Sequence, residues 1–239
     1  GILPKSGTIH PLMSMQDTIV DIFRTMGYEV LYGPEIELAK YNFDLLRIPE
    51  NHPARDVWDT FYIEADKKLS GPNVPLLRTH ISPMQIRVME KRKPPIRFIS
   101  PGRIFRHEAT DTTHEANYYY CEGLAIDKGL TFGDLLGTLE AFFQALFGAD
   151  VEVRFQPSYY PFVEPGCELF MKGAKGWLEM LGCGMIHPEV LKNMNVDPKK
   201  YSGFAFGLGM DRIMMYYYGV PDVRMSYQGD LRFLEQFPV

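Results

Sequence analysis

Apolar residues recur every three or four positions in three segments of the chain, which is the spacing of one face of a helix. The segments are residues 11–26, 131–147 and 210–218. Gly27 and Gly148 directly follow the first two segments, at the position where many helices end. The pattern therefore predicts three amphipathic helices.

Two local signals mark where helices begin. Thr131, followed three residues later by Asp134, predicts a capped start for the second helix. Residues 82–85 (SPMQ) form the pattern of a capping box with proline at the first helical position. A fourth helix is expected to run from there to about Lys91.

Short apolar or alternating stretches between glycines, prolines and polar loops predict β-strands. They are residues 28–32, 75–79, 96–106, 118–126, 151–156, 160–164, 177–181 and 204–206. Residues 41–60 hold two prolines and scattered charges and are predicted to form a long ordered loop, while Gly207 and Gly209 are predicted to make a turn. Because strands outnumber helices and neighbouring strands look hairpin-linked, the expected fold class is α+β with a mainly antiparallel sheet.

The composition is that of an ordinary globular chain. With 239 residues, of which 46% are hydrophobic and 23% charged, disorder and fibrous repeats are excluded, and one domain over residues 1–239 is expected. The longest apolar stretch, Ile213 to Val220, has eight residues. A membrane helix needs roughly 20, so no membrane span is predicted.

Charge and cysteine content limit the partners and the compartment. Thirty acidic and 25 basic residues give a formal net charge of −5, so a nucleic-acid partner would have to be gripped by a local patch or by another chain. The three cysteines, Cys121, Cys167 and Cys183, form no C-x-x-C pair, which argues against a disulfide framework or a structural zinc site. A reducing cytoplasm is therefore expected.

The candidate chemistry rests on arginines. The sequence has no Walker loop, no G-x-G-x-x-G after a strand, no H-E-x-x-H and no G-x-S-x-G. Arg103 and Arg106 end a predicted strand, and Arg212 opens a predicted helix. Guanidinium groups are well suited to bind phosphate oxygens, but most surface arginines are simply solvated. Taken one at a time, these arginines are therefore compatible with phosphate binding and with ordinary solvent exposure.

Six stretches change this picture when they are considered together, in order. They are NFDLLRIPENHPARDVWDTFY (42–62), LLRTHISPMQIR (76–87), SPGRIFRHEATDTTHEA (100–116), RFQPSYYPFVEPG (154–166), WLEMLGCGMIHPEVL (177–191) and FAFGLGMDR (204–212). The third and the last resemble motifs two and three of class II aminoacyl-tRNA synthetases. As a set, the six resemble the alpha chains of the phenylalanyl-tRNA synthetases, and the resemblance runs from His10 to nearly Val239.

The resemblance implies a reaction. ATP and phenylalanine would form an aminoacyl-adenylate and pyrophosphate, and the aminoacyl group would then move to the terminal ribose of tRNA. Because the carboxylate of the substrate is itself the nucleophile, the protein needs no Ser, Cys or His nucleophile, and positioning with charge compensation suffices. The resemblance also implies a beta chain in a heterotetramer.

At the ATP end, the resemblance assigns each residue a role. Arg106 is expected at the α-phosphate and Arg212 at the γ-phosphate, both as catalytic residues. Tyr118 is expected to stack on adenine, and Glu108 resembles the carboxylate adjacent to Arg106 at the ATP end. Glu164 matches a Mg²⁺ ligand that the family shares with its second subunit, consistent with a metal that takes few protein carboxylates plus phosphate oxygens.

The amino-acid pocket follows from the same resemblance. Its expected residues are His80, Ser82, Tyr120 and Glu122 at the polar end, Tyr160 and Phe162 at the edge of the side-chain pocket, and Ala205 at its floor. Three positions depart from the family pattern. Tyr120 stands where bacterial chains usually have Gln, Tyr160 where Phe is usual, and Asp211 where Glu is common.

Two alternatives stay open. The pocket departures favour a paralogue that activates another amino acid or charges a non-tRNA acceptor. The second alternative is a non-catalytic module for dimerisation or regulation. The charged site residues argue against it, because such a module would have no physical need for them.

Assembly is also expected from the resemblance. The first helix and the turn Tyr32-Gly33-Pro34 resemble motif one, so pairing through that surface is expected, with a homodimer as the alternative to the heterotetramer. The helical arm with which family members reach tRNA is expected to be missing, so this chain should need a partner to charge tRNA.

Overall fold

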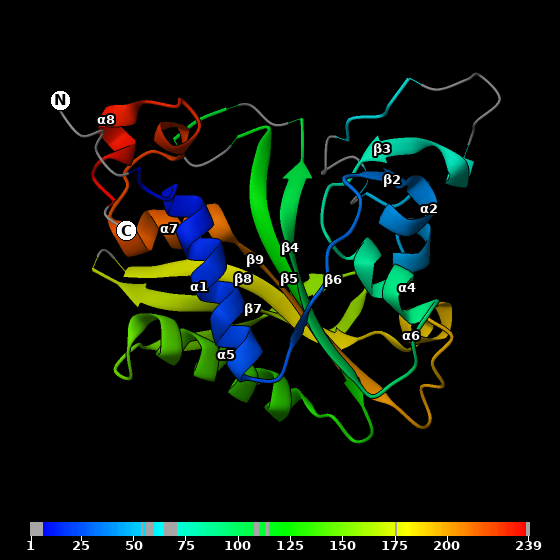
Figure 1. Ribbon diagram of the computed structural model, residues 1–239. Helices are drawn as coiled ribbons and strands as arrows, with labels where there is room; N and C mark the ends of the chain where they lie inside the picture. Colours follow the sequence, from blue (N-terminus) through cyan, green and yellow to red (C-terminus); the bar gives the residue numbers. More distant parts are fainter. Residues whose placement is uncertain are drawn as a thin grey trace.

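The computed structural model describes residues 7–53, 55, 60–64, 71–107, 110–112, 115–174 and 176–237. Within these residues, seven strands form one sheet in the order β1-β4-β5-β9-β8-β7-β6 (Figure 1). Only β1 and β4 pair in parallel; all other neighbouring strands are antiparallel. The bounds are β1 Glu29–Val30, β4 Ile96–Phe105, β5 Asn117–Asp127, β6 Val153–Tyr160, β7 Val163–Gly173, β8 Gly176–Ile186 and β9 Ser202–Gly209.

Helices cover both faces of this sheet, and each face has its own core (Figure 1). The first core contains buried side chains of α1 (Pro11–Thr25), α5 (Phe132–Phe147) and α7 (Met210–Tyr218). The second contains those of α2 (Ala39–Asn42), α4 (Pro83–Met89) and α6 (Pro188–Asn193). The remaining elements are the two-stranded sheet of β2 (Ile36–Leu38) and β3 (Pro75–Leu77), α8 (Leu231–Leu234) and the 3-10 turns η1 (Asp44–Leu46), η2 (Gly71–Asn73) and η3 (Val223–Ser226).

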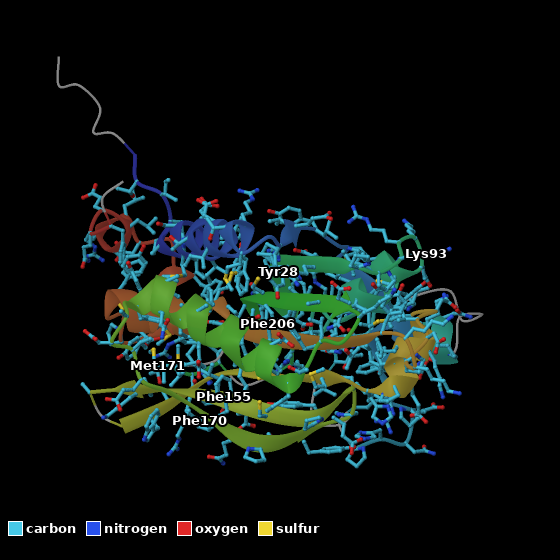
Figure 2. The ribbon with its side chains drawn as sticks, turned by 90° about the horizontal axis from the view of Figure 1, so that it is seen from below. Tyr28, Lys93, Phe155, Phe170, Met171 and Phe206 are labelled. Carbon is cyan, nitrogen blue, oxygen red and sulfur yellow. The ribbon has the colours of Figure 1, made fainter. Side chains whose placement is uncertain are left out.

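Aromatic stacking joins the first core to the centre of the sheet. The Phe23 ring of α1 lies 4.7 Å from the ring of Phe142 and 5.2 Å from that of Phe206, measured between centroids. Tyr28 meets Phe206 edge-on at 6.3 Å, and both are labelled in Figure 2. Since side chains alternate across a strand, the neighbours of Phe206, Ala205 and Gly207, face the other side of the sheet.

The strongest helix predictions are confirmed. Helices α1, α5 and α7 lie where the periodicity places them. The Thr131 hydroxyl accepts a hydrogen bond from the Asp134 backbone N–H at 3.3 Å, and the Asp134 carboxylate accepts one from the Thr131 N–H at 2.7 Å. The α+β class with a mainly antiparallel sheet is confirmed as well.

Three local predictions are wrong. The capping box at 82–85 does not form, because the Ser82 side chain makes no capping bond and donates instead to Glu122. Residues 41–60 are not one long loop, since α2 and η1 occupy their start and bury Tyr41 and Leu46. The glycines at 207 and 209 make no turn; both continue β9, and an added Cβ at Gly207 would lie 2.8 Å from Cε1 of Tyr120.

Several strand boundaries also differ. The stretch 160–164 is not one strand, because it spans the end of β6, a turn at Pro161–Phe162 and the start of β7. The stretch 28–32 is reduced to the two residues of β1, and helix α6 was not predicted. None of the helices in the described ranges has the length and apolar run that crossing a bilayer requires.

Candidate functional site

A cavity of about 340 Å³ opens on the face of the sheet that carries the second core. It brings together ten of the twelve residues that the resemblance assigns. They are His80, Ser82, Arg106, Tyr118, Tyr120, Glu122, Tyr160, Phe162, Ala205 and Arg212. Of the other two, Glu108 lies outside the described residues, and Glu164 is not among the lining residues.

Glu122 is the centre of the polar end. Its carboxylate is buried, and its two oxygens accept hydrogen bonds from the Ile81 backbone N–H at 2.8 Å and the Ser82 hydroxyl at 2.6 Å. Burial raises the pKa of Glu122, and these hydrogen bonds oppose that rise. The site therefore holds an acidic group in surroundings that would gain from a neighbouring cation.

His80 contributes a neutral ring to the same end. Burial lowers the pKa of His80 to about 3, and the nearby Arg106 charge acts in the same direction. Its Nε2 lies 2.8 Å from the backbone oxygen of Asn42, and its ring stacks on Phe162 with centroids 6.3 Å apart. His80 is thus a wall and hydrogen-bonding residue rather than a positive charge.

Two tyrosines line the cavity with their hydroxyls already bonded to the protein. Tyr120 Oη donates to the backbone oxygen of Gly207 at 3.0 Å, and Tyr160 Oη donates to Oε1 of Glu168 at 3.2 Å. Burial raises the pKa of both phenols, so both remain protonated donors. Tyr160 also stacks on Phe162, with ring centroids 6.0 Å apart.

The charged part of the cavity is built differently. Arg106 Nε donates to the Thr79 backbone oxygen at 3.1 Å, and its guanidinium lies 5.5 Å from the centre of the Tyr118 ring. Arg212 Nη1 donates to the backbone oxygen of Glu179 at 2.9 Å, and its side chain is half exposed. Both arginines thus place a permanent positive charge at the cavity wall.

The lining also includes four polar residues to which the sequence analysis gave no site role: Gln85, Glu115, Glu179 and Asp211, the last noted only as a departure from the family pattern. Asp211 accepts hydrogen bonds from the Tyr119 backbone N–H at 2.7 Å and the Tyr227 hydroxyl at 2.6 Å. Burial raises the pKa of Asp211 to about 6. A signal existed for Glu179, a charged residue inside an apolar strand, and Gln85 was misread as part of a capping box.

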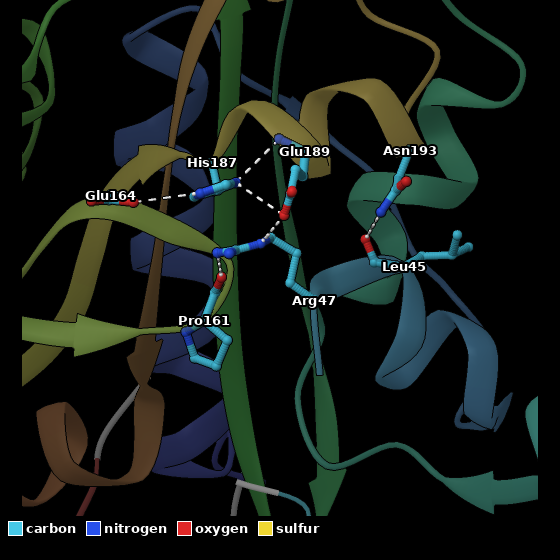
Figure 3. Close-up of polar contacts among 7 residues, drawn as sticks. All are labelled: Leu45, Arg47, Pro161, Glu164, His187, Glu189 and Asn193. Atoms are coloured by element: carbon cyan, nitrogen blue, oxygen red, sulfur yellow. Dashed lines mark hydrogen bonds and ion pairs between the residues drawn. The ribbon is translucent and has the colours of Figure 1, made fainter. Parts of the chain in front are cut away.

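Glu164 lies at a separate place, at the junction of β7 and α6 (Figure 3). Its carboxylate is 76% exposed and 3.4 Å from Nε2 of His187, whose Nδ1 caps α6 by accepting from the Glu189 N–H. Arg47 links the two parts of this junction, because it donates hydrogen bonds to the Pro161 backbone oxygen at 2.6 Å and to the Glu189 carboxylate at 2.5 Å. Within the described ranges, no group of three or more His, Cys, Asp or Glu side chains could hold a metal ion.

Comparison with known proteins agrees with this geometry. The family model for the tRNA synthetases class II core domain (F) matches residues 3–237. A solved structure, the pyrrolysyl-tRNA synthetase from Desulfitobacterium hafniense, superposes with a TM-score of 0.70 over 95% of this chain and 76% of that one. At 16% sequence identity, this likeness establishes the class II synthetase fold alone.

Sequence relatives narrow the assignment. The phenylalanine–tRNA ligase alpha subunits of Clostridium botulinum and Clostridium kluyveri are each 48% identical, over 97% and 99% of this chain and 69% and 71% of their own lengths. That of Caldicellulosiruptor saccharolyticus is 49% identical over 97% of this chain and 69% of its own length. The chain belongs to the phenylalanine–tRNA ligase alpha subunits, a family of class II synthetases.

Proposed function

We propose that this chain is the catalytic chain of a cytoplasmic two-chain ligase that activates phenylalanine with ATP and transfers it to tRNA. The observation that carries the proposal is a single cavity lined by Arg106 and Arg212, by the buried carboxylate of Glu122 and by the ring of Phe162. These groups match the phosphates, the ammonium group and the aromatic side chain of the two small substrates.

The polar end would hold the amino acid. Its ammonium group would give Glu122 the positive partner that burial makes favourable. The neutral His80 would leave the site without a competing charge at the ammonium position. The side chain would then lie against Tyr160 and Phe162, with Ala205 at the floor of the slot.

The reaction would be an in-line displacement. The substrate carboxylate would attack the α-phosphorus of ATP, forming a new O–P bond while the bond to the bridging oxygen of the β-phosphate breaks and pyrophosphate leaves. Arg106 would neutralise charge at the α-phosphate and Arg212 at the γ-phosphate, with Tyr118 stacking on the adenine ring. A preorganised charge of this kind acts mainly by stabilising the transition state.

Mg²⁺ would supply charge neutralisation on the ATP phosphates and would be held by few protein carboxylates. Glu179 suits this role because its carboxylate lines the cavity and lies 3.8 Å from Arg212. Glu164 remains the proposed ligand of a magnesium ion shared with a second subunit, in keeping with its exposed carboxylate. Glu108 is proposed as a further carboxylate at the ATP end.

ATP–pyrophosphate exchange tests the proposal across all twenty amino acids, first with this chain and then with a beta chain added. Phenylalanine should give the fastest exchange. A faster exchange with a non-aromatic amino acid would replace the proposal with the paralogue reading, which the tyrosines at 120 and 160 favour.

The need for a partner has its own test. The chain carries a net charge of −5, and gripping a tRNA backbone takes several well-placed Lys and Arg contacts. We expect tRNA charging to require the beta chain, with pairing through the α1 surface and the turn at Gly33. A monomer that charges tRNA unaided at about 150 mM salt, where charges are screened beyond about 8 Å, would refute this.

A further inference from the structure

One row of paired residues crosses the sheet beneath the cavity. Glu122 of β5 pairs with Gly207 of β9, Gly207 with Gly182 of β8, and Gly182 with Glu168 of β7. Directly paired residues of neighbouring strands point to the same face of a sheet. The row therefore holds two carboxylates on the cavity face, with two glycines between them.

The two glycines leave space that two rings fill. An added Cβ at Gly207 would lie 2.8 Å from Cε1 of Tyr120, and one at Gly182 would lie 2.6 Å from Oη of Tyr160. At both positions an added side chain would force the tyrosine ring above it to move. The Tyr120 and Tyr160 rings therefore lie directly on the strands, and they form part of the cavity wall in place of strand side chains.

Glu168 holds the second of these rings. Its Oε1 accepts a hydrogen bond from Tyr160 Oη at 3.2 Å and another from Ser158 Oγ at 2.7 Å. Glu168 is not among the lining residues of the cavity, whereas Tyr160 is. The Tyr160 ring is therefore a hydrogen-bonded link between this carboxylate and the cavity.

That ring is the first of three in contact. Tyr160 stacks on Phe162 at 6.0 Å with an interplanar angle of 29°, and Phe162 stacks on His80 at 6.3 Å with an angle of 25°. The three rings all line the cavity. A shift of Tyr160 would displace the wall along which the substrate ring lies under the proposed function.

We propose that Glu168 is a positioning residue for amino-acid recognition, which acts by fixing the Tyr160 ring against Gly182. The inference rests on the proposed function, since it takes the slot beside Tyr160 and Phe162 as the amino-acid site. Without Glu168, the partly buried Tyr160 hydroxyl loses the carboxylate that accepts its hydrogen bond and keeps the Ser158 hydroxyl as its neighbour. A ring that shifts toward this weaker acceptor narrows or distorts the slot.

The test is ATP–pyrophosphate exchange with phenylalanine in the assembled two-chain enzyme. Glu168→Ala should raise the KM for phenylalanine about tenfold and change kcat less than threefold, because the residue acts on binding and touches no reacting atom. Glu168→Gln keeps an acceptor oxygen and should stay within threefold of wild type. Ser158→Ala removes the other donor to the same oxygen and should leave KM within twofold.

The decisive variant is the double substitution Tyr160→Phe with Glu168→Ala. Removing the hydroxyl removes the need for an acceptor, so the KM of the double variant should lie within threefold of that of Tyr160→Phe alone. A KM of the double variant that stays tenfold above that of Tyr160→Phe would overturn the proposal and leave Glu168 as a residue that merely ties β6 to β7. If Glu168→Ala lowers the Tm by more than a few degrees, Glu168→Leu keeps the bulk without an acceptor and takes its place.

Failure of the proposed function has a different signature. If wild-type enzyme shows no exchange that depends on phenylalanine, the proposed function is wrong, and the series is repeated with whichever amino acid supports exchange. If wild type exchanges normally and the Glu168→Ala variant has an unchanged KM, only the role of Glu168 is wrong.

Discussion

The two ends of the cavity are constructed by opposite means. At the proposed amino-acid end, Glu122 is buried and both of its carboxylate oxygens already accept hydrogen bonds from the protein. At the proposed ATP end, Arg212 is half exposed and is anchored through a backbone carbonyl. The first end holds a buried, hydrogen-bonded carboxylate whose pKa is raised by burial, while the second presents a permanent positive charge near solvent.

This difference fits what each end would recognise under the proposed function. A small aromatic amino acid differs from its competitors by only a few atoms, so its site needs fixed walls and hydrogen bonds that are satisfied before binding. A triphosphate carries several charges on freely rotating bonds, so guanidinium groups that always stay protonated are sufficient. Substitutions at the ATP end should therefore mainly lower kcat, and substitutions at the amino-acid end should mainly raise the KM for phenylalanine.

The largest effect is expected at the ATP end. Arg106→Ala and Arg212→Ala should each lower the exchange rate by roughly 10²–10³, because each removes a preorganised charge, while Tm remains near wild type. Arg154→Ala is the matched control: its guanidinium lies over the rings of Phe170 and Trp177, away from the cavity lining. Exchange within threefold of wild type in a folded Arg106 or Arg212 variant would contradict the assignment.

The next effect should appear in binding. Glu122→Gln replaces the buried carboxylate with a neutral amide, so the KM for phenylalanine should rise about 10²-fold with a smaller change in kcat. Glu90→Gln serves as control, since Glu90 accepts a hydrogen bond from Tyr41 and does not line the cavity. Equal losses in kcat and in kcat/KM would show that the two ends do not divide the work as described.

Asp211 gives a pH test. Burial raises its pKa from 3.8 to about 6, so the stability that its neutral form provides is complete below about pH 4 and is lost as the pH rises through 6. In Asp211→Asn this change is absent. Relative to wild type, the variant should gain roughly 2–3 kcal/mol in free energy of unfolding between about pH 4 and pH 7, measured by urea denaturation. If the free energies of unfolding of the variant and of wild type differ by the same amount from pH 4 to pH 7, Asp211 does not titrate in this range.

The smallest effect concerns the floor of the slot. Ala205→Gly removes one methyl group from the cavity wall, so acceptance of para-chlorophenylalanine relative to phenylalanine should rise about tenfold in exchange assays. Ala125→Gly is the control, because Ala125 is buried in the first core and should change Tm without changing the ratio. An unchanged ratio in Ala205→Gly would show that this residue does not limit the slot.

The sequence predicts most of the residues that line the cavity but not the residues behind them that hold those side chains in place. Ordered motifs lead to Arg106 and Arg212, and periodicity leads to α1 and α5, because both signals are local. Glu168 escapes such reasoning, since its contact with Tyr160 depends on the register of β6 and β7 across a turn.

Local signals also mislead where a distant partner competes. The pattern at 82–85 predicts a capping box, yet the Ser82 hydroxyl is used by Glu122, 40 residues further along the chain. Likewise, Pro165 and Gly166 interrupt the sequence pattern of a strand, so the full length of β7 was not predicted. The strand forms because it pairs with β6 on one side and with β8 on the other.

The alternation of strand β9 has a consequence for how such a protein can change over generations. All three residues line the cavity, but Ala205 and Gly207 point to the cavity face of the sheet, whereas the ring of Phe206 stacks on Phe23 in the first core. Mutations at position 205 should therefore alter which compounds are accepted, and mutations at position 206 should alter thermal stability. A side chain at position 207 would displace the Tyr120 ring. A library randomised at positions 205 and 206 should separate into these two classes, so that selection for a new substrate can proceed without first destabilising the fold.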